Sequence, residues 1–366
     1  MKMNKQKIII CILAFISFKL FSESLLIPFE IEGKIGFVNQ DLQIIFQPAY
    51  KSIFKTRKKM AIVKDFDSDL VILFSNRRKD VNYRESFFYG NTGFLGEDYY
   101  FKSFPNSKSK FDKYVIYDFE GNEIADFYDR TLYSSTNTQW IKCRHERKSS
   151  GTFIDDYMNL TGNLKWPDND FHSILFKLPD DNSFVVKDLN FNDLIVDESG
   201  QLISKELSTI DGYSNGLFLG AKSFYEKGFF DKNLNLIIGI TGYPEYGRSF
   251  NSGVISCIIE NGLIYIYEPD KKTISSDWAI INNMGEIVKQ GIHAKNISNF
   301  SDEGTAIITM TDDKKYLINK SGEIITKEYY DEIQESINGY YRAKKANLDY
   351  LLSSETGESY CCRKLN

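Results

Sequence analysis

The chain has 366 residues, with 28 Phe and 23 Tyr against only 7 Pro, and a formal net charge of −5. This length accommodates one large β-domain or two ordinary domains, and the many aromatic residues with few long helical patterns favour an all-β core. The acidic balance excludes nucleic acid as an expected partner, because nucleic-acid binding depends on clustered Lys and Arg that neutralise phosphates.

The first 24 residues have the pattern of a signal peptide. Three lysines within the first seven residues precede an apolar stretch from Ile8 to Phe18, and the small residues Ser22 and Ser24 follow at positions typical of a cleavage site. The stretch is too short to span a membrane. We therefore expect an exported protein (periplasmic, cell-surface or secreted) that begins near Leu25 and has no membrane span after cleavage; the alternative is an N-terminal anchor. Loss of the four Lys and one Glu in residues 1–24 would change the net charge from −5 to −8.

A short sequence phrase recurs along the rest of the chain. In each copy an apolar residue precedes Asp or Asn, then come two or three intervening residues and Gly, and a second apolar run follows. Five copies contain all of these features: Tyr117–Gly121, Met158–Gly162, Val196–Gly200, Ile281–Gly285 and Ile318–Gly322. Two further copies keep the Asp or Asn and lose the Gly: Val38–Leu42 and Phe230–Leu234. Self-similarity at a period of a few tens of residues is typical of a repeat architecture.

Each phrase predicts a β-hairpin turn. The Asp or Asn side chain can accept hydrogen bonds from backbone N–H groups further along, and Gly supplies the positive φ of a type I turn followed by a bulge. The Gly-equivalent positions are 34 to 51 residues apart, except for one gap of 79. The long gap predicts a degenerate copy around Leu70–Phe74, and the interval of 51 predicts an inserted loop near Glu268–Lys272.

A second recurring feature follows each hairpin and introduces another strand. An aromatic or apolar residue is followed by Ser, Asn or Asp and then Gly, in the segments Tyr213–Gly216, Phe250–Gly253, Phe300–Gly304 and Ile337–Gly339. One unit is therefore three or four short antiparallel strands of about 40 residues, too small to bury both of its faces alone, so neighbouring units must stack.

These features predict an all-β array of seven or eight units over residues 25–366. A β-propeller is the preferred form, because three- or four-stranded units of about 40 residues suit its blades. An open β-solenoid or superhelix is the alternative. We also expect residues 25–31 to pair with the hairpin at 347–362, so that the two ends of the chain complete one unit.

The repeats resemble those of the WG-repeat (KWG-type) bacterial proteins. Their unit begins Gly-Lys-Trp-Gly-Phe-Ile-Asp, which Gly33–Asn39 matches except at the Trp, and Lys227–Asp231 matches similarly. Asp277–Asn282 keeps the Trp and lacks the Gly, and no intact Trp-Gly pair occurs in the chain. The resemblance covers most of residues 33–358. It implies a β-repeat domain over 25–366 and transfers no catalytic residues.

The cysteines and histidines do not form a recognisable reactive site. Cys143 and Cys257 lie in expected strands, where Cys is usually a small buried hydrophobe, whereas Cys361 and Cys362 are adjacent near the C-terminus. Export would permit disulfides, but four cysteines allow three pairings and the sequence does not choose among them. The only histidines are His145, His172 and His293, without an HExxH or GxSxG motif. We therefore expect no catalytic, cofactor-binding or metal-binding residues, and no cofactor.

Two functions follow from these expectations. The first is a non-enzymatic binding module of the bacterial envelope, which contacts a protein or glycan through loops on one face of the array. The alternative is a glycan-active enzyme with carboxylates on the central face of a propeller. Paired carboxylates about 5 to 9 Å apart in a cleft would support the enzyme.

Overall fold

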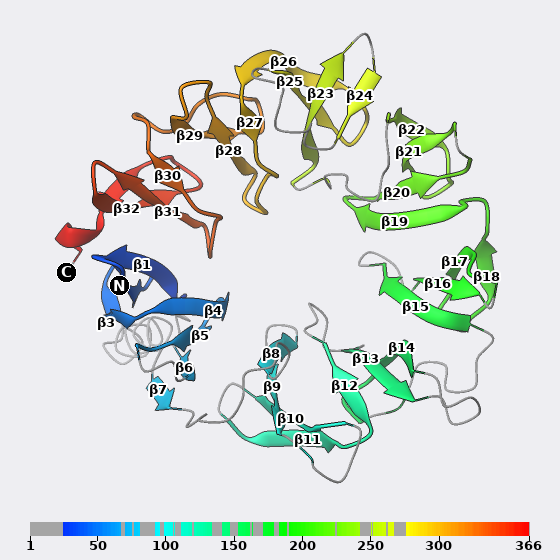
Figure 1. The fold of residues 1–366 in the computed structure, drawn as a ribbon. Coiled ribbons are helices and arrows are strands. Elements are labelled where there is room, and N and C mark those ends of the chain that lie inside the picture. The colour runs from blue at the N-terminus through cyan, green and yellow to red at the C-terminus, as the bar shows by residue number, and fades with distance from the viewer. Residues whose placement is uncertain are drawn as a thin grey trace, which may run out of the picture. The chain divides into compact units, whose positions relative to one another are not determined.

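The fold is seen in a computed structural model of the chain (Figure 1). The structure describes residues 25–66, 70–74, 77–80, 92–95, 99–104, 106, 111–118, 121–133, 141–146, 153–161, 163, 171–178, 183–188, 190–223, 225–241, 250, 252–260, 263–266 and 276–365. The expected signal peptide at 1–24 and the loop expected near Glu268–Lys272 lie outside these residues.

The described residues are all-β, apart from one 3-10 turn, and form nine antiparallel sheets of three or four strands. They divide into two compact units. The first unit contains the described residues up to 80 and residues 362–365; the second contains those from 92 to 361. No helix in the described parts of the chain has the length and apolarity needed to cross a bilayer.

The first unit has two sheets, β1-β2-β3 and β4-β5-β6-β7. Its elements are β1 (Ile27–Ile31), β2 (Lys34–Val38), β3 (Ile44–Tyr50), β4 (Ser52–Arg57), β5 (Met60–Lys64), β6 (Leu70–Phe74), β7 (Arg77–Asp80) and the 3-10 turn η2 (Cys362–Lys364). Strand β6 lies where a degenerate copy was expected, around Leu70–Phe74, and pairs with β5 along its whole length; the two residues after it, 75 and 76, lie outside the described residues.

The second unit has seven sheets that follow one another along an arc (Figure 1). The first four are made of β8 (Thr92–Leu95), β9 (Tyr99–Phe104), β10 (Lys113–Asp118) and β11 (Glu123–Phe127); β12 (Arg130–Leu132), β13 (Ile141–Glu146) and β14 (Phe153–Met158); β15 (Phe171–Lys177), β16 (Phe184–Asp188), β17 (Asp193–Val196) and β18 (Leu202–Ser204); and β19 (Thr209–Ser214), β20 (Leu217–Ala221), β21 (Lys227–Phe230) and β22 (Leu236–Gly239). The last three are made of β23 (Val254–Glu260), β24 (Leu263–Tyr265), β25 (Ser276–Asn282) and β26 (Ile287–Ala294); β27 (Asn296–Ile297), β28 (Thr305–Thr309) and β29 (Lys315–Asn319); and β30 (Glu332–Ile333), β31 (Tyr340–Lys345), β32 (Leu348–Ser353) and β33 (Ser359–Cys361).

Each sheet is built from strands that are consecutive in the sequence, and the described strands of one sheet do not pair with those of another. The sheet β24-β23-β25-β26 alone departs from simple sequence order. This arrangement excludes the β-solenoid, in which strands of successive turns pair into long sheets. The sheets are propeller blades, and the preferred fold class, an all-β array of the β-propeller type, is confirmed.

The core lies between neighbouring sheets, as the stacking argument predicts. Several middle strands are largely buried, and β20 is buried at all five residues. One apolar cluster joins Val185 and Ile195 of the sheet β15–β18 to Phe218 and Phe230 of the sheet β19–β22. Burial of this kind stabilises a stack by about 25 cal/mol per Å² of apolar surface removed from water.

The predicted turns are confirmed by their hydrogen bonds. In each described copy, the Asp or Asn Oδ1 accepts the backbone N–H four residues later, as between Asn319 and Glu323 at 3.0 Å. Wherever it is described, the residue three positions on has positive φ, which is 73° at Gly322 and 61° at Leu234. We call these segments Asx turns; the copies lie at Asn39, Asp118, Asn159, Asp197, Asp231, Asn282 and Asn319.

The turns at Gly285 and Gly357 lie against the backbone of an earlier part of the chain. A Cβ placed on Gly285 would lie 3.3 Å from the carbonyl oxygen of Ile237 in β22, and a Cβ on Gly357 would lie 2.3 Å from that of Ile325. The glycine at such a turn therefore serves two requirements, a positive φ and a close approach of two backbones.

The pairing expected between the two ends of the chain is wrong. Strand β1 pairs with β2, and β33 pairs with β32, so each end has a sheet of its own. Glu32 and Gly33, with φ of 52° and 75°, form the tight turn that closes β1 onto β2, which costs less chain entropy than a distant pairing.

Candidate functional site

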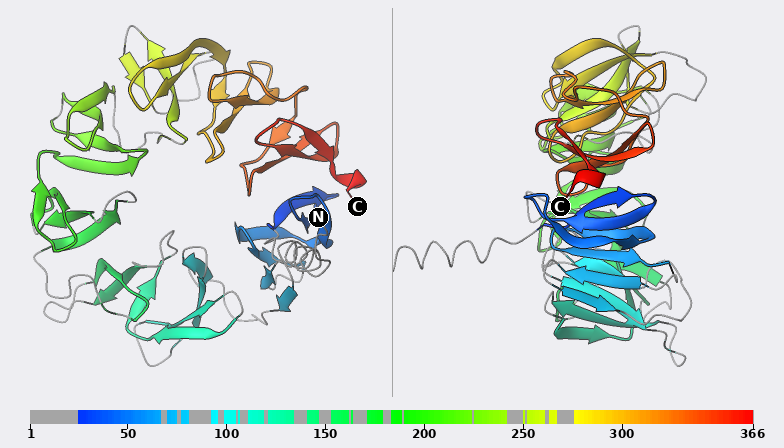
Figure 2. Two further views of the ribbon diagram at one scale, coloured as in Figure 1. Left: turned by 180° about the vertical axis from the view of Figure 1, so that it is seen from behind. Right: turned by 90° about the vertical axis from the view of Figure 1, so that its left-hand side faces the viewer.

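The turns of the second unit gather at its two faces. Seen edge-on, its strands run from one face to the other (Figure 2). A sheet of four antiparallel strands ends on the face where it began, and the chain passes to the next sheet through a short connection, such as the single residue between β26 and β27. The Asx turns, which join third and fourth strands, therefore share one face, which we call the Asx face. Connections between second and third strands, and between sheets, lie on the opposite face.

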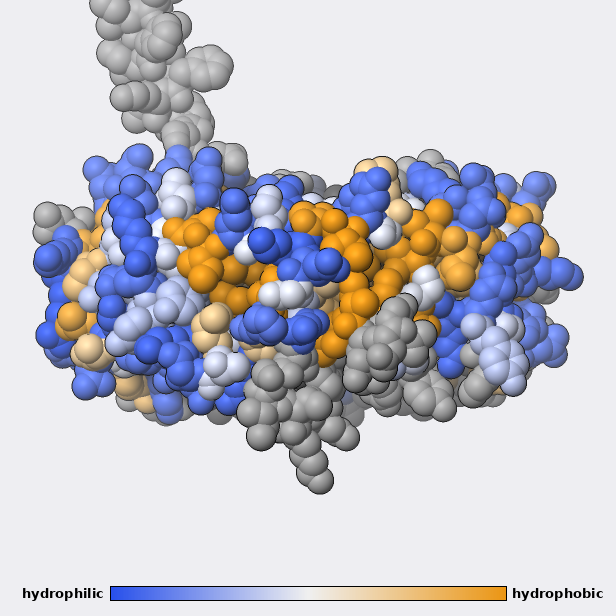
Figure 3. Space-filling view, turned by 90° about the horizontal axis from the view of Figure 1, so that it is seen from above, coloured by the Kyte–Doolittle hydropathy of each residue, from blue (hydrophilic) through white to orange (hydrophobic). Residues whose placement is uncertain are grey.

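Exposed aromatic and exposed aliphatic side chains lie on different parts of the second unit. The exposed aliphatic residues and Met284 lie in Asx turns or in the fourth strands that leave them, and these outer strands give the apolar surface seen in Figure 3. All the exposed aromatic residues described in the second unit belong to the opposite face. They are Phe104, Tyr128, Phe153, Phe191, Tyr225 and Tyr329, and we call this surface the aromatic face.

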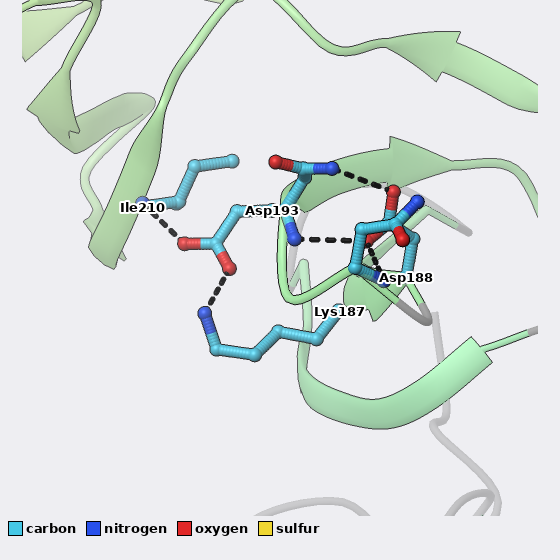
Figure 4. A network of polar contacts seen from close by, with 6 residues as sticks. Lys187, Asp188, Asp193 and Ile210 are labelled. Carbon is cyan, nitrogen blue, oxygen red and sulfur yellow. Dashed lines mark hydrogen bonds and ion pairs between the residues drawn. The ribbon is translucent and has the colours of Figure 1, made fainter.

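The turn between β16 and β17 presents Phe191 on the aromatic face. Oδ1 of Asp188 accepts the backbone N–H groups of Asn190 and Asn192, both at 2.8 Å, and Oδ2 accepts the Asn192 side-chain amide at 2.9 Å (Figure 4). These hydrogen bonds hold the pKa of Asp188 below its usual value, and the bond from the Asn192 side chain has the largest effect. The carboxylate therefore stays ionised and keeps the turn in one shape.

Phe191 has an unfavourable backbone conformation that burial does not offset. Its φ is 66°, and the residue is 62% exposed. A positive φ is rare for a bulky residue and costs on the order of 1–2 kcal/mol. Leu234 occupies the equivalent position in the Asx turn at Asp231. It also has positive φ but is only 4% exposed, so packing compensates for its strain. Strain at a residue that is mostly exposed points to a role outside folding.

The neighbouring sheet presents Tyr225 in the same way. The turn between β20 and β21 is closed by a hydrogen bond from the Lys222 N–H to the Glu226 carbonyl oxygen at 2.9 Å. The Ser223 hydroxyl accepts the N–H groups of Tyr225 and Glu226 at 3.3 and 3.1 Å. The Tyr225 side chain is 93% exposed at the tip of this turn.

A buried carboxylate connects the two sheets beneath these turns (Figure 4). Asp193, the first residue of β17, accepts the backbone N–H of Ile210 in β19 at 2.8 Å and pairs with Nζ of Lys187 at 2.5 Å. The Asp193 side chain is only 5% exposed, so the Lys187 partner compensates for the desolvation of its charge. On the surface, Lys222 pairs with Glu206 of the connection between the sheets at 3.7 Å. The positions of Phe191 and Tyr225 are thereby fixed relative to each other.

Charges on the aromatic face are arranged in opposite-sign pairs. Ion pairs join Lys113 to Asp126, Arg130 to Asp129, Lys314 to Asp312, and Lys345 to Glu328. Hydrogen bonds from Lys314 and Arg130 hold the pKa of Asp312 and of Asp129 below their usual values. Two of these lysines also lie over Tyr329, with Nζ 5.0 Å (Lys314) and 4.6 Å (Lys345) from the ring centroid. The face is thus aromatic and polar, with its described charges largely balanced.

The cysteines and histidines singled out in the sequence are not brought together. Cys143 and Cys257 are buried in separate apolar clusters, as expected, Cys362 is buried and Cys361 is partly exposed. His145 is buried in β13, and His293 pairs across strands with Asp277 at 2.6 Å on the exposed surface. The His172 side chain lies outside the described residues. Within the described residues, no three His, Cys, Asp or Glu side chains are grouped to hold a metal ion.

The sequence reasoning missed the turn at Asp188 and both aromatic tips. Asp188-Leu189-Asn190-Phe191-Asn192 resembles the repeated phrase, but Phe replaces the Gly and Lys187 replaces the preceding apolar residue, so a search for the phrase has to relax both positions to find it. Tyr225 follows a Ser that replaces the Asx residue, which no phrase anchored on Asp or Asn detects.

Comparisons with known proteins give a likeness of fold. No protein-family model and no curated protein sequence matches the chain. A crystal structure of a eukaryotic initiation factor superposes with a TM-score of 0.54 at 11% identity, covering 93% of this chain and 96% of that one. A crystal structure of the computationally designed Ika8 protein covers 92% of this chain and 89% of its own at 10% identity, with a TM-score of 0.33. At this identity the first likeness concerns the fold alone, and the second carries no argument.

Proposed function

We propose that the chain is an exported, non-enzymatic binding module of the bacterial envelope and that the aromatic face is its binding surface. The observation that carries the proposal is the separation of exposed side chains, with aromatic residues on one face and aliphatic residues in the Asx turns and on the outer strands. Exposed aromatic residues held on rigid turns are typical of recognition surfaces, because they offer a large contact area at a low entropic cost.

Two further observations support this proposal. The Asp188 and Ser223 turns fix their aromatic tips through backbone hydrogen bonds, so binding would not have to order these segments. The resemblance to WG-repeat proteins and the basic–apolar–small pattern of residues 1–24 support an exported repeat protein.

The binding surface is tested by capture with matched variants of the full, C-terminally tagged chain. Wild-type protein, a Phe191→Ala/Tyr225→Ala variant and a Leu202→Ala/Ile287→Ala variant are incubated with envelope extracts. Leu202 and Ile287 are 53% and 52% exposed but lie on fourth strands, away from the aromatic face. We expect the same bound material with wild type and the aliphatic variant, and its loss with the aromatic variant. Equal binding by all three proteins, or by none, would overturn the proposal.

Export is tested separately by cell fractionation and N-terminal sequencing. We expect the mature protein outside the cytoplasm, beginning near Leu25. A chain that retains Met1 would contradict this part of the proposal and leave the binding surface untouched.

A further inference from the structure

The geometry points to a neutral carbohydrate polymer as the ligand of the aromatic face, with Phe191 and Tyr225 as adjacent stacking platforms. This inference rests on the proposed function and names the chemical class that the surface would bind. The exposure of the rings, the paired charges around them and the polar groups beside them support a neutral carbohydrate as the ligand.

Both rings stand out from the tips of turns. Tyr225 is 93% exposed and Phe191 is 62% exposed. Aromatic anchors of protein interfaces usually fill pockets of their partner, whereas a flat, protruding ring suits a ligand with flat apolar faces. Pyranose rings have such faces, formed by axial C–H groups, and they stack on the electron-rich face of an aromatic ring.

The charges of the aromatic face also favour a neutral ligand. Ion pairs on this face join residues close in space, such as Lys222 with Glu206 and Lys187 with Asp193, so these charges already have partners within the protein. A polyanion would need a surplus of Lys and Arg, and a basic protein segment would need a surplus of carboxylates. A neutral ligand requires neither surplus.

Polar side chains adjoin both rings in the sequence. Asn190 and Asn192 flank Phe191, and Ser223 and Glu226 flank Tyr225, so amide, hydroxyl and carboxylate groups adjoin both platforms. Such groups donate and accept hydrogen bonds with sugar hydroxyls. Apolar stacking combined with short polar side chains matches a molecule that has C–H faces and hydroxyl edges.

The two sheets that carry Phe191 and Tyr225 are joined to each other. The Asp193–Ile210 hydrogen bond and the Lys222–Glu206 pair hold the sheets β15–β18 and β19–β22 against each other. A ligand that spans both turns gains from the second contact without a new loss of translational freedom. A polymer or long oligosaccharide should therefore bind more tightly than a monosaccharide.

The test measures retardation of the native full-length protein in gels that contain a soluble polysaccharide. The neutral probes are β-glucan, mannan and dextran, and the anionic probe is polygalacturonate. We expect at least one neutral polymer to retard the wild type, with little change on adding about 0.5 M NaCl, where charge interactions are screened. Oligosaccharides of that polymer should compete more strongly as they lengthen.

Variants separate binding from folding. Phe191→Gly should weaken binding about tenfold, since it removes one stacking contact, and Phe191→Gly/Tyr225→Ala should abolish detectable retardation. Because Gly tolerates the positive φ of this position, the melting temperature of Phe191→Gly should equal or exceed that of the wild type. Phe191→Tyr, which keeps a ring, should bind as the wild type does, and so should Leu202→Ala.

The possible outcomes distinguish the two proposals. No retardation by any neutral polymer, salt-sensitive retardation by polygalacturonate alone, or equal retardation of the double variant would overturn the carbohydrate inference. If capture from envelope extracts still depended on Phe191 and Tyr225, the binding surface would stand with a ligand of another class. If that dependence were also absent, both proposals would fail.

Discussion

The turns at 188–192 and 231–235 share one backbone design but use it for different ends. In both, an Asp side chain accepts the N–H groups two and four residues on, and a large apolar residue occupies the position of positive φ. Leu234 lies in the apolar cluster between two sheets, whereas Phe191 is 62% exposed. The same local strain is thus compensated by packing in one turn and left uncompensated in the other. Local sequence alone does not separate a structural turn from a candidate binding turn.

The largest effect is expected where the positive-φ residue approaches another backbone. Gly357→Ala would place a Cβ 2.3 Å from the carbonyl oxygen of Ile325 at a φ of 68°. Strain and the forced shift together should lower the free energy of unfolding by about 3 kcal/mol in urea titrations. Gly216→Ala is the control, since its φ is 85° but nothing lies within 4 Å of the added atom. It should cost only about 1 kcal/mol, and equal losses would contradict the close approach.

The second prediction compares the two turns directly. Leu234→Ala removes buried contacts and keeps the strain, so it should cost about 2.5 kcal/mol. Leu234→Gly removes the same contacts but relieves the strain, and its loss should be smaller by about 1 kcal/mol. Phe191→Gly, with little burial to lose, should raise stability by up to about 1 kcal/mol. Urea unfolding of the three variants tests this order; a Phe191→Gly variant that unfolds more easily would show that Phe191 supports the fold.

The third prediction concerns the buried link beneath the aromatic face. Asp193→Ala leaves the Ile210 N–H without its acceptor and Lys187 without its partner, which should cost about 2 kcal/mol. The Lys187 side chain is 32% exposed and can rehydrate, so the loss stays below that of a fully buried pair. Asp193→Asn keeps an acceptor and should cost about half as much. Asp312→Ala breaks an exposed ion pair and should change stability by less than about 0.5 kcal/mol in the same assay.

The smallest effect is a dependence of stability on acid. Hydrogen bonds lower the pKa of Asp188, Asp197 and Asp231 in the folded state, so each stabilises the fold above its unfolded pKa, near 3.8. That contribution is lost as the pH falls below about 4 and through the folded pKa. Exchanging the three for Asn, which fills this position at Asn282 and Asn319, should keep the turns and flatten the fall in melting temperature between about pH 4 and pH 2. An unchanged slope would show that other carboxylates dominate.

Much of the fold could be predicted because its signals are local. An Asx turn is determined by a side chain and two N–H groups within five residues, so Asp197 and Asn319 were recognised with their flanking strands. The pairing of β1 could not be recognised in the same way. A terminal strand can pair with its neighbour in the sequence or with the other end of the chain, and here the two-residue turn at Glu32–Gly33 selects the neighbour, β2.

The candidate site was harder to predict than the fold. Turns at the two ends of a strand look alike in a sequence, and only the sheet topology shows that Phe191 and Tyr225 share a face. The burial that separates Phe191 from Leu234 is a property of the stack, since it depends on what the neighbouring sheet places above each turn.

The contacts of the turns at Gly285 and Gly357 with earlier parts of the chain give this end of the second unit a direction. Gly285 rests on β22 and Gly357 on Ile325, both of which are translated earlier. As the chain leaves a ribosome or a translocon, each new sheet therefore meets a surface that already exists, and assembly can proceed from the N-terminal side without waiting for later residues. Fragments truncated from the C-terminus should consequently retain more structure than fragments of equal length truncated from the N-terminus.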